Sequence, residues 1–298
     1  MTATSPATPP IEHPRQHPAG PLRPPIPYFG GKQTIAQRII AEMPAHKHYV
    51  EPYCGSLAVL LAKEPVAHET VNDLDGDLVN FWRVLRDQPD ALARVCALTP
   101  HSRGEFEATR EPTDDPLENA RRIWVQLAQG RAAIRQRTGW RFFETGSSSS
   151  MGMPGYLAGY VKRIPPAAER LARVTLECRP ALDIITRYGE HEDVLLYVDP
   201  PYLGSTRTSG KYLVEMQGDD EHQDLLNALL ARRASVVLSG YPSTLYDAAL
   251  TNWRRVAIPT STGQGGTWSD RTEILWINRP ANPRQISIFD LLDDEANA

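Results

Sequence analysis

The sequence predicts an α/β protein whose strands form one open sheet, and two observations lead to this fold class. Short apolar segments with strand character alternate along the chain with segments whose apolar residues recur at helical spacing. One strand candidate, DVLLYVD at 193–199, runs into Pro200 and Pro201, which end a strand because proline cannot donate to the ladder. Strands that alternate with helices are typical of an open α/β sheet.

The first part of the alternation runs from residue 34 to residue 87. Ile35, Ile39 and Met43 share one face of a predicted helix over 34–43, which Pro44 ends. We then expect a strand at 48–52, a buried helix at 56–63, a strand at 69–74 and a helix at 75–87. Asp75 is the predicted cap of that last helix.

The alternation resumes after residue 165. We expect strands at 174–178, 193–199, 234–241 and 272–278, and a helix at 220–233. Residues 100–165 break the rhythm, because they are rich in loops and contain helical patches such as 118–129. The sequence therefore predicts one main domain, formed by 27–99 and 166–280, with an inserted and mostly helical domain at 100–165.

Composition limits the class of protein. The hydrophobic fraction of 41% is enough for a sizeable core. Cys54, Cys96 and Cys178 show no spacing typical of a metal site, as is usual in a reducing cytoplasm. No apolar run approaches the roughly 18 residues of a membrane span. Residues 1–26 are rich in proline and are expected to be disordered. We expect a cytoplasmic protein without a bound metal.

Charge is unevenly distributed. Residues 121–170 contain nine lysines or arginines and two glutamates, a net charge of +7. The rest of the chain therefore carries −11, since the whole chain carries −4. An acidic body with one basic insertion suggests that a polyanion binds at the insertion. The alternative is a solvated, arginine-rich helix surface.

The stretch that follows the strand at 193–199 suggests chemistry on an amino group. Open α/β sheets bind ligands at the carboxyl ends of their strands, where Asp199 is expected. Asp199 and the carbonyl of Pro200 offer two adjacent acceptors for a planar –NH2 group, and Tyr202 offers a ring for stacking. Gripping both hydrogens frees the nitrogen lone pair for attack. The alternative is a strand-ending turn with a surface aspartate.

Two other stretches point to a cofactor that contains a nucleoside. YVEPYCGS at 49–56 places Gly55 between a strand and a helix, where a charged group can approach the backbone. VNDLD at 71–75 places Asp73 at the end of the next strand, where it can accept from ribose hydroxyls. The G-x-G-x-x-G pattern is missing from both, which disfavours NAD.

These motifs resemble, in kind and in order, those of the Dam-like DNA adenine-N6 methyltransferases, in the branch common in phages and actinobacteria. The resemblance runs from residue 27 to residue 280. The motifs in chain order are PYFGGK at 27–32, YVEPYCGS, VNDLD, YVDPPY at 197–202, VVLSGYPSTLYDAAL at 236–250 and RTEILWINRP at 271–280. The resemblance implies a Rossmann-like sheet, S-adenosylmethionine as methyl donor, a target-recognition domain at 100–165 and base flipping in double-stranded DNA.

The resemblance also implies roles for individual residues in cofactor binding. Tyr28 and Lys32 would contact the cofactor. Gly55 would line its methionine end, and Asp73 would hold its ribose. Asp183, in ALDII, resembles the acid that reads the cofactor's adenine.

For the target base, the resemblance assigns the tetrad Asp199, Pro200, Pro201 and Tyr202. Asp199 and the Pro200 carbonyl would take the hydrogens of N6, while Tyr202 stacks on the ring. Asp199 would also lie close to the cofactor. The residues expected to contact DNA are Arg131, Arg135, Arg137 and Arg141.

Two departures from the family pattern are present. The family often has a second glycine in its cofactor loop, where this chain has Ser56 and Leu57. It also commonly has an asparagine in the strand after the catalytic one, where this chain reads LSGY at 238–241. We expect weaker or differently shaped cofactor contacts with activity retained, because the tetrad is intact.

The C-terminal tail at 281–298 carries a separate motif. QISIF, from Gln285 to Phe289, resembles the short peptide with which bacterial proteins bind the DNA sliding clamp. The alternative is a terminal amphipathic helix packed on the body. We otherwise expect a monomer.

Three rival functions are considered. Cytosine-N4 methylation uses the same amino-group chemistry, but its tetrad usually begins with serine, so Asp199 favours adenine. A DNA-binding relative without catalysis is disfavoured by the intact tetrad. A small-molecule or RNA methyltransferase is the third, since a basic insertion fits nucleic acid without separating DNA from RNA.

Overall fold

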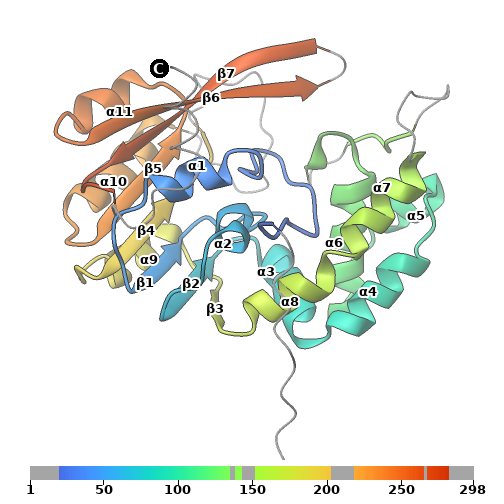
Figure 1. Ribbon diagram of the computed structural model, residues 1–298. Helices are drawn as coiled ribbons and strands as arrows, with labels where there is room; N and C mark the ends of the chain where they lie inside the picture. The colour runs from blue at the N-terminus through green and yellow to red at the C-terminus, as the bar shows by residue number, and fades with distance from the viewer. Residues whose placement is uncertain (1–19, 135–137, 143–151, 203–217, 265–266, 282–298) are drawn as a thin grey trace, which may run out of the picture.

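The protein is described by a computed structural model that covers residues 20–134, 138–142, 152–202, 218–264 and 267–281. A seven-stranded sheet occupies one half of the molecule and a group of helices the other (Figure 1). The strands are β1 (His48–Glu51), β2 (His68–Asn72), β3 (Val174–Glu177), β4 (Val194–Val198), β5 (Ser235–Gly240), β6 (Arg254–Gln264) and β7 (Thr267–Ile277). The predicted α/β class is confirmed.

The strand order places a ligand site at one point of the sheet. The order is β3-β2-β1-β4-β5-β7-β6, in which β7 alone runs antiparallel to its neighbours β5 and β6 within the described sheet. From β1 the chain adds β2 and β3 on one side, and it then adds β4 and β5 on the other. The carboxyl ends of β1 and β4 therefore flank the switch point where open α/β sheets bind ligands.

Helices cover both faces of the sheet. Because successive strand residues point to opposite faces, Leu195 and Tyr197 pack with α1 (Ala36–Ala41) and α2 (Ala58–Ala62). Leu196 and Val198 face the other way. They pack with the helices α9 (Ala181–Tyr188), α10 (Asp219–Leu230) and α11 (Thr244–Ala249). All five residues of β4 are buried, so Asp199 emerges at the end of a strand that is covered on both sides.

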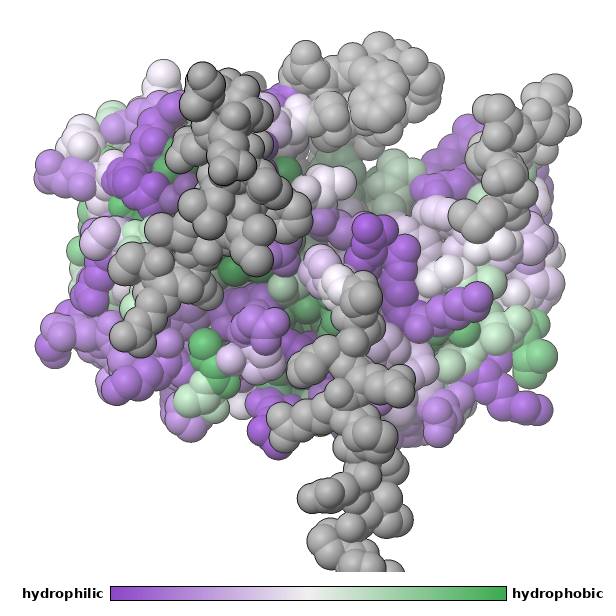
Figure 2. Space-filling model, in the orientation of Figure 1, coloured by the Kyte–Doolittle hydropathy of each residue, from purple (hydrophilic) through white to green (hydrophobic). Residues whose placement is uncertain are grey.

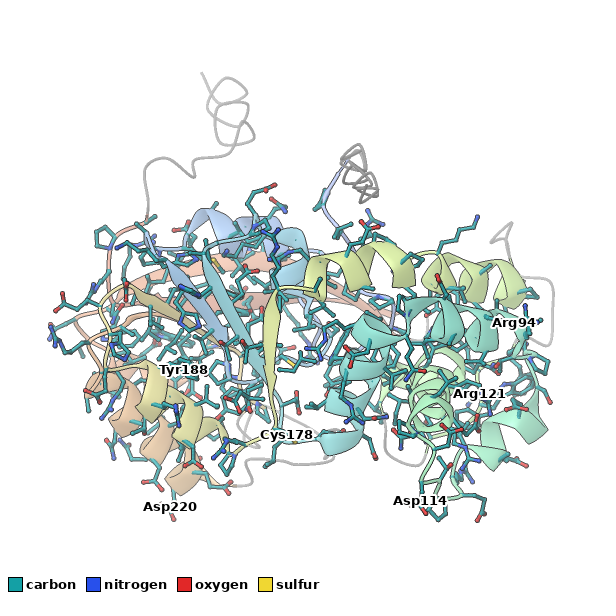
Figure 3. All side chains as sticks on the ribbon, turned by 90° about the horizontal axis from the view of Figure 1, so that it is seen from below. Arg94, Asp114, Arg121, Cys178, Tyr188 and Asp220 are labelled. Atoms are coloured by element: carbon teal, nitrogen blue, oxygen red, sulfur yellow. The ribbon has the colours of Figure 1, made fainter. Side chains whose placement is uncertain are left out.

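The helical half lies between β2 and β3 in the sequence. Its helices are α3 (Gly76–Asp87), α4 (Pro89–Leu98), α5 (Arg103–Ala108), α6 (Pro116–Gln129), the 3-10 turn η1 (Arg131–Ala133), α7 (Gly152–Val161) and α8 (Ile164–Leu171). Asp75 caps α3 as predicted, since its carboxylate accepts from the amides of Asp77 and Leu78. Figure 3 shows Arg94 and Arg121 in this half, Tyr188 and Asp220 in the sheet half, and Cys178 between them.

Three features of the fold differ from what the sequence led us to expect. The helical half begins with α3, well before residue 100. Ile26 is buried in the core, although it lies in the segment expected to be disordered. The strand β6 was not expected, because RRVAIPTSTGQ has few apolar residues and contains Pro259. The described part of β6 pairs only with β7, and proline is tolerated in such an edge strand.

Among the described residues, no helix has both the length and the apolar composition needed to cross a bilayer. On the face seen in Figure 2, hydrophilic residues predominate and hydrophobic residues appear in small groups.

A buried ion cluster joins the two halves. Glu69 of β2 accepts hydrogen bonds through both carboxylate oxygens from Arg170 of α8, one of them at 2.8 Å. Lys63 also contacts Glu69, at 3.4 Å, and the side chains of all three residues are less than a tenth exposed. Arg170 additionally donates to the carbonyl of Leu60 at 3.1 Å. Glu69 therefore balances two buried cations at the junction of sheet and helices.

We predict that Glu69→Gln lowers the free energy of unfolding by about 3 kcal/mol, because it leaves two buried cations without their counter-ion. The control is Glu177→Gln, since Glu177 pairs with Arg179 at 3.5 Å near the surface. That change should cost no more than about 1 kcal/mol. Urea unfolding followed by circular dichroism measures both. Equal effects of the two substitutions would contradict the assignment.

Candidate functional site

A cavity of about 430 Å³ lies at the carboxyl ends of β1, β2 and β4, within the size range of small-molecule sites. The sequence-predicted residues that line it are Tyr28, Lys32, Gly55, Asp73, Asp199 and Pro201. Four separate motifs therefore converge on one site at the switch point of the sheet. Pro200, Tyr202 and Asp183 are not among the described lining residues, although Ala181 and Leu182 next to Asp183 are.

Lys32 and Asp199 form a buried ion pair at this cavity. The Nζ of Lys32 lies 2.8 Å from Oδ2 of Asp199, and the side chains are 6% and 19% exposed. Lys32 also donates to the carbonyl of Gly30 at 2.8 Å, which fixes the turn of PYFGGK around the ammonium. The lysine that was expected to contact the cofactor thus holds the aspartate of the tetrad.

Tyr202 is fixed by a second carboxylate. Its hydroxyl accepts from Lys32 at 2.5 Å and donates to Glu273 of β7, whose two oxygens lie 2.8 and 3.0 Å away. The Tyr202 ring packs against Tyr241 with centroids 4.4 Å apart. Ser239 of β5 also donates to Glu273, at 2.5 Å. The ring that was expected to stack on the target base is therefore held at its hydroxyl end by a buried network.

The two acids nearest the switch point have raised pKa values. Burial raises the pKa of Asp199 and the charge of Glu273 adds to this, while Lys32 opposes both, and the net pKa is about 6. Burial raises the pKa of Glu51 to about 8, against hydrogen bonds from Tyr49 and from the amide of Leu60. At neutral pH Asp199 is therefore mostly ionised and Glu51 mostly protonated.

The loop after β1 is shaped for close approach to a ligand. Gly55 has φ +45°, and a side chain there would meet the Tyr28 ring at 3.0 Å. Its amide donates to Oδ2 of Asp73 at 3.0 Å, and Oδ1 accepts from the amide of Asp75 at 3.0 Å. Asp73 therefore joins the loops after β1 and β2, whatever else it binds.

The structure shows how the chain accommodates the absence of the second glycine. Leu57 stands where the family often has glycine, and it adopts the left-handed conformation with φ 57° and ψ 27°. Its side chain is fully buried in the core. Packing therefore holds a leucine in a conformation that usually favours glycine.

The charge of the cavity suits a cation. Besides the mostly protonated Glu51, its described lining includes one lysine and five acids, which are Asp73, Asp75, Asp199, Glu221 and Asp224. It also has an apolar side, formed by Leu74, Pro180, Ala181 and Leu182. Such a site can hold a positively charged molecule that has a flat apolar part.

Three residues of the site lie in quoted motifs but were assigned no role from the sequence. Glu51 lines the cavity at the end of β1, and Tyr197 lines it from within β4. The Tyr197 hydroxyl is buried and has no hydrogen-bond partner among the described residues, although Ser239 lies near it. Glu273 belongs to a strand whose next four residues are all buried. An acid at the start of such an apolar run was the available signal for Glu273.

The arginines expected to contact DNA lie in the helical half. Arg131 is exposed in η1, and Arg141 donates to the hydroxyl of Tyr156 at 2.8 Å. Arg135 and Arg137 lie outside the described residues. The chain at Arg131 is joined to the cavity loop, because the amide of Phe29 donates to the carbonyl of Ala133 at 3.0 Å.

Aromatic rings and arginines gather next to these positions. His101 stacks on Trp140 with centroids 4.4 Å apart, and Trp140 stacks on Phe142 at 5.4 Å. The guanidinium of Arg103 lies 5.1 Å from the Trp140 ring and 5.2 Å from the Phe142 ring. Arg131 lies 5.7 Å from the Phe142 ring. We call His101, Arg103, Arg131, Trp140 and Phe142 the arginine–aromatic stack.

Comparison with known proteins identifies relatives of the chain. Residues 28–144 match the family described as D12 class N6 adenine-specific DNA methyltransferase. The retron Ec67 DNA adenine methylase of Escherichia coli is 26% identical over 269 residues, which cover 84% of this chain and 90% of that protein. The type II methyltransferase M1.LlaDCHI of Lactococcus lactis subsp. cremoris is 32% identical over 83 residues, and the match spans 28% of each chain.

Among solved structures, a SAM-dependent methyltransferase from Agrobacterium tumefaciens has a TM-score of 0.33 and 12% identity, and the match covers 82% of this chain and 60% of that one. This likeness is too low to bear on function. The family match includes Lys32, Gly55 and Asp73 of the cavity, and the Escherichia coli relative matches most of the chain. Over residues 28–144 the chain is therefore similar to the D12 class of N6 adenine-specific DNA methyltransferases.

Proposed function

We propose that the protein transfers a methyl group from S-adenosylmethionine to N6 of adenine in double-stranded DNA. The observation that carries this proposal is the position of Asp199, an ionisable carboxylate at the carboxyl end of β4 inside the cavity. The family match supports adenine as the base. Asp199 also favours adenine over cytosine N4, because cytosine enzymes usually have serine at the first position of the tetrad.

The cavity fits S-adenosylmethionine by charge and shape. That cofactor supplies a methyl group on a cationic sulfonium centre, and its amino acid end carries an ammonium group. The acidic lining of the cavity favours both charges. Gly55 lets the ligand approach the backbone beside Tyr28, and Asp73 stands at the predicted ribose position. For the adenine end, Leu74 and Leu182 form the apolar rim, and Asp183 lies in the first turn of α9.

Asp199 and the carbonyl of Pro200 accept the two hydrogens of the target N6. This contact localises the nitrogen lone pair, which would form the bond to the methyl carbon as the carbon–sulfur bond of the donor breaks and its electron pair stays on sulfur. The nitrogen has one proton too many after transfer, and the ionised Asp199 carboxylate takes it. Catalysis comes mainly from position and from acceptors aimed at the amino group. Pro201 lines the cavity beside Asp199, while the held Tyr202 ring is the proposed stacking partner of the base.

The helical half is the proposed target-recognition domain. A duplex hides N6 in the base stack, so the target nucleotide must rotate out at a cost of a few kcal/mol. The arginine–aromatic stack supplies cations for phosphates and flat faces for bases, the two features that nucleic acid binding uses. The amide of Phe29 links this region to the loop that carries Lys32. Arg131, Arg135, Arg137 and Arg141 remain the predicted contacts.

The finer predictions from the sequence are kept as part of this proposal. They are membership of the phage and actinobacterial branch, action as a monomer in the cytoplasm, and binding of the sliding clamp through Gln285–Phe289. The QISIF segment lies outside the described residues.

The methylated base identifies the function. We predict that incubation with isotope-labelled S-adenosylmethionine and unmethylated bacterial DNA places label on N6-methyladenosine after digestion to nucleosides. Mass spectrometry of the nucleosides measures it. Label on N4-methylcytosine would keep the chemistry but overturn the base. Cofactor binding without label on any of several bacterial DNAs would contradict methyl transfer, and no cofactor binding would favour the DNA-binding relative.

We predict that a substitution in the arginine–aromatic stack lowers the affinity of the protein for DNA. Arg103→Ala should weaken binding to a DNA duplex and reduce the salt slope of log K by about 1, because one phosphate contact is lost. Fluorescence anisotropy at several salt concentrations measures both quantities. The matched control is Arg94→Ala, an exposed arginine of α4 in the same half, which should change neither. Equal losses in both variants would show a non-specific charge effect instead.

A further inference from the structure

Glu273 is a buried acid in RTEILWINRP, and no role was assigned to it from the sequence. Its side chain is 5% exposed and lies at the start of the apolar part of β7. Its carboxylate accepts from Tyr202 at 2.8 and 3.0 Å and from Ser239 at 2.5 Å. A buried carboxylate destabilises the folded protein unless it has hydrogen-bond or ionic partners, and Glu273 has both.

The described partners of Glu273 come from three separate segments of the chain. Ser239 belongs to β5, Tyr202 ends the tetrad after β4, and Lys32 belongs to the loop before α1. Lys32 lies 3.7 Å from Glu273 and 2.8 Å from Asp199. One buried ammonium is therefore shared between two carboxylates, of which only Asp199 lines the cavity.

This sharing affects how Asp199 can act. A carboxylate held by its own exclusive cation is a weak acceptor for a neutral amino group, since the cation already satisfies it. A second carboxylate near the same ammonium draws part of that charge away. It also disfavours the ionised form of Asp199, because like charges repel in a buried site.

We propose that Glu273 is a positioning residue of the methyl-transfer site, which shares Lys32 with Asp199 and fixes Tyr202 so that Asp199 stays available to the target amino group. This inference rests on the proposed function and deepens it. When Asp199 takes the proton of N6, it loses its charge and its hold on Lys32. Glu273 then keeps the buried ammonium paired until the proton leaves Asp199.

The pH profile of methyl transfer is the readout that separates this role from a purely structural one. The titratable groups around Asp199 are Lys32, Glu51, Glu273, Tyr197, Tyr202 and Tyr246. Asp199 must be ionised to accept the proton, so the rate should rise with pH through its pKa of about 6. The pKa of Glu51 lies at about 8, so any titration of Glu51 appears separately at higher pH.

Glu273→Gln removes the negative charge that lies near Asp199, so that Lys32 is no longer shared between these two carboxylates. We predict that the acidic limb of the profile moves to lower pH by half a unit or more. The plateau rate should fall about tenfold, because a weaker base accepts the proton less well. Glu273→Asp keeps the charge and should keep the limb at its wild-type position. Single-turnover methylation with saturating labelled S-adenosylmethionine and unmethylated bacterial DNA, from pH 5 to 9, measures both.

Tyr202→Phe provides an independent test if Glu273→Gln does not fold. It removes a hydroxyl that lowers the pKa of Asp199 and that donates to Glu273, so the limb should move to higher pH. Opposite shifts in the two variants support the proposal. An unchanged limb in Glu273→Gln, or in Tyr202→Phe where the first variant is unfolded, would overturn it. A wild-type protein that methylates nothing would instead contradict the proposed function.

Discussion

The buried ammonium of Lys32 is the interaction on which the rest of the site depends. A cation that is only 6% exposed is stable there because Asp199, Glu273 and the Tyr202 hydroxyl surround it. Asp199 and Tyr202 follow β4 and Glu273 lies within β7, so the charge fixes the relative positions of separate segments. The glycine-rich turn of PYFGGK serves this purpose by delivering the lysine and capping it with the Gly30 carbonyl.

The sheet provides the second constraint. The switch of strand order between β1 and β4 brings Glu51, Asp73 and Asp199 to one edge of the sheet, although they are far apart in sequence. Backbone contacts then tighten this edge, because Asp73 binds the amide of Gly55 and Trp82 donates to the Gly55 carbonyl at 3.0 Å. The cavity is thus built largely from the ends of rigid elements, which suits chemistry that depends on position.

Sequence patterns predicted the parts of the fold that local physics controls. Apolar runs indicated the parallel strands, Asp75 indicated a helix start, and two prolines indicated where β4 ends. Motif order indicated Lys32, Gly55, Asp73 and Asp199, all of which meet in one cavity. Glu273 was assigned no role and β6 was not expected, because a single acid before an apolar run and an edge strand with a proline give weak local signals. Their places depend on pairing between β5, β7 and β6, which is a tertiary property.

The methyl-transfer rate of Asp199→Ala tests whether that carboxylate accepts the N6 proton. The matched control is Asp193→Ala, which removes an exposed carboxylate just before β4, at the opposite end of the same strand. The account predicts that Asp199→Ala folds, by circular dichroism, but transfers label at least about a thousandfold more slowly, while Asp193→Ala retains the wild-type rate. Transfer by Asp199→Ala at near the wild-type rate would contradict the account.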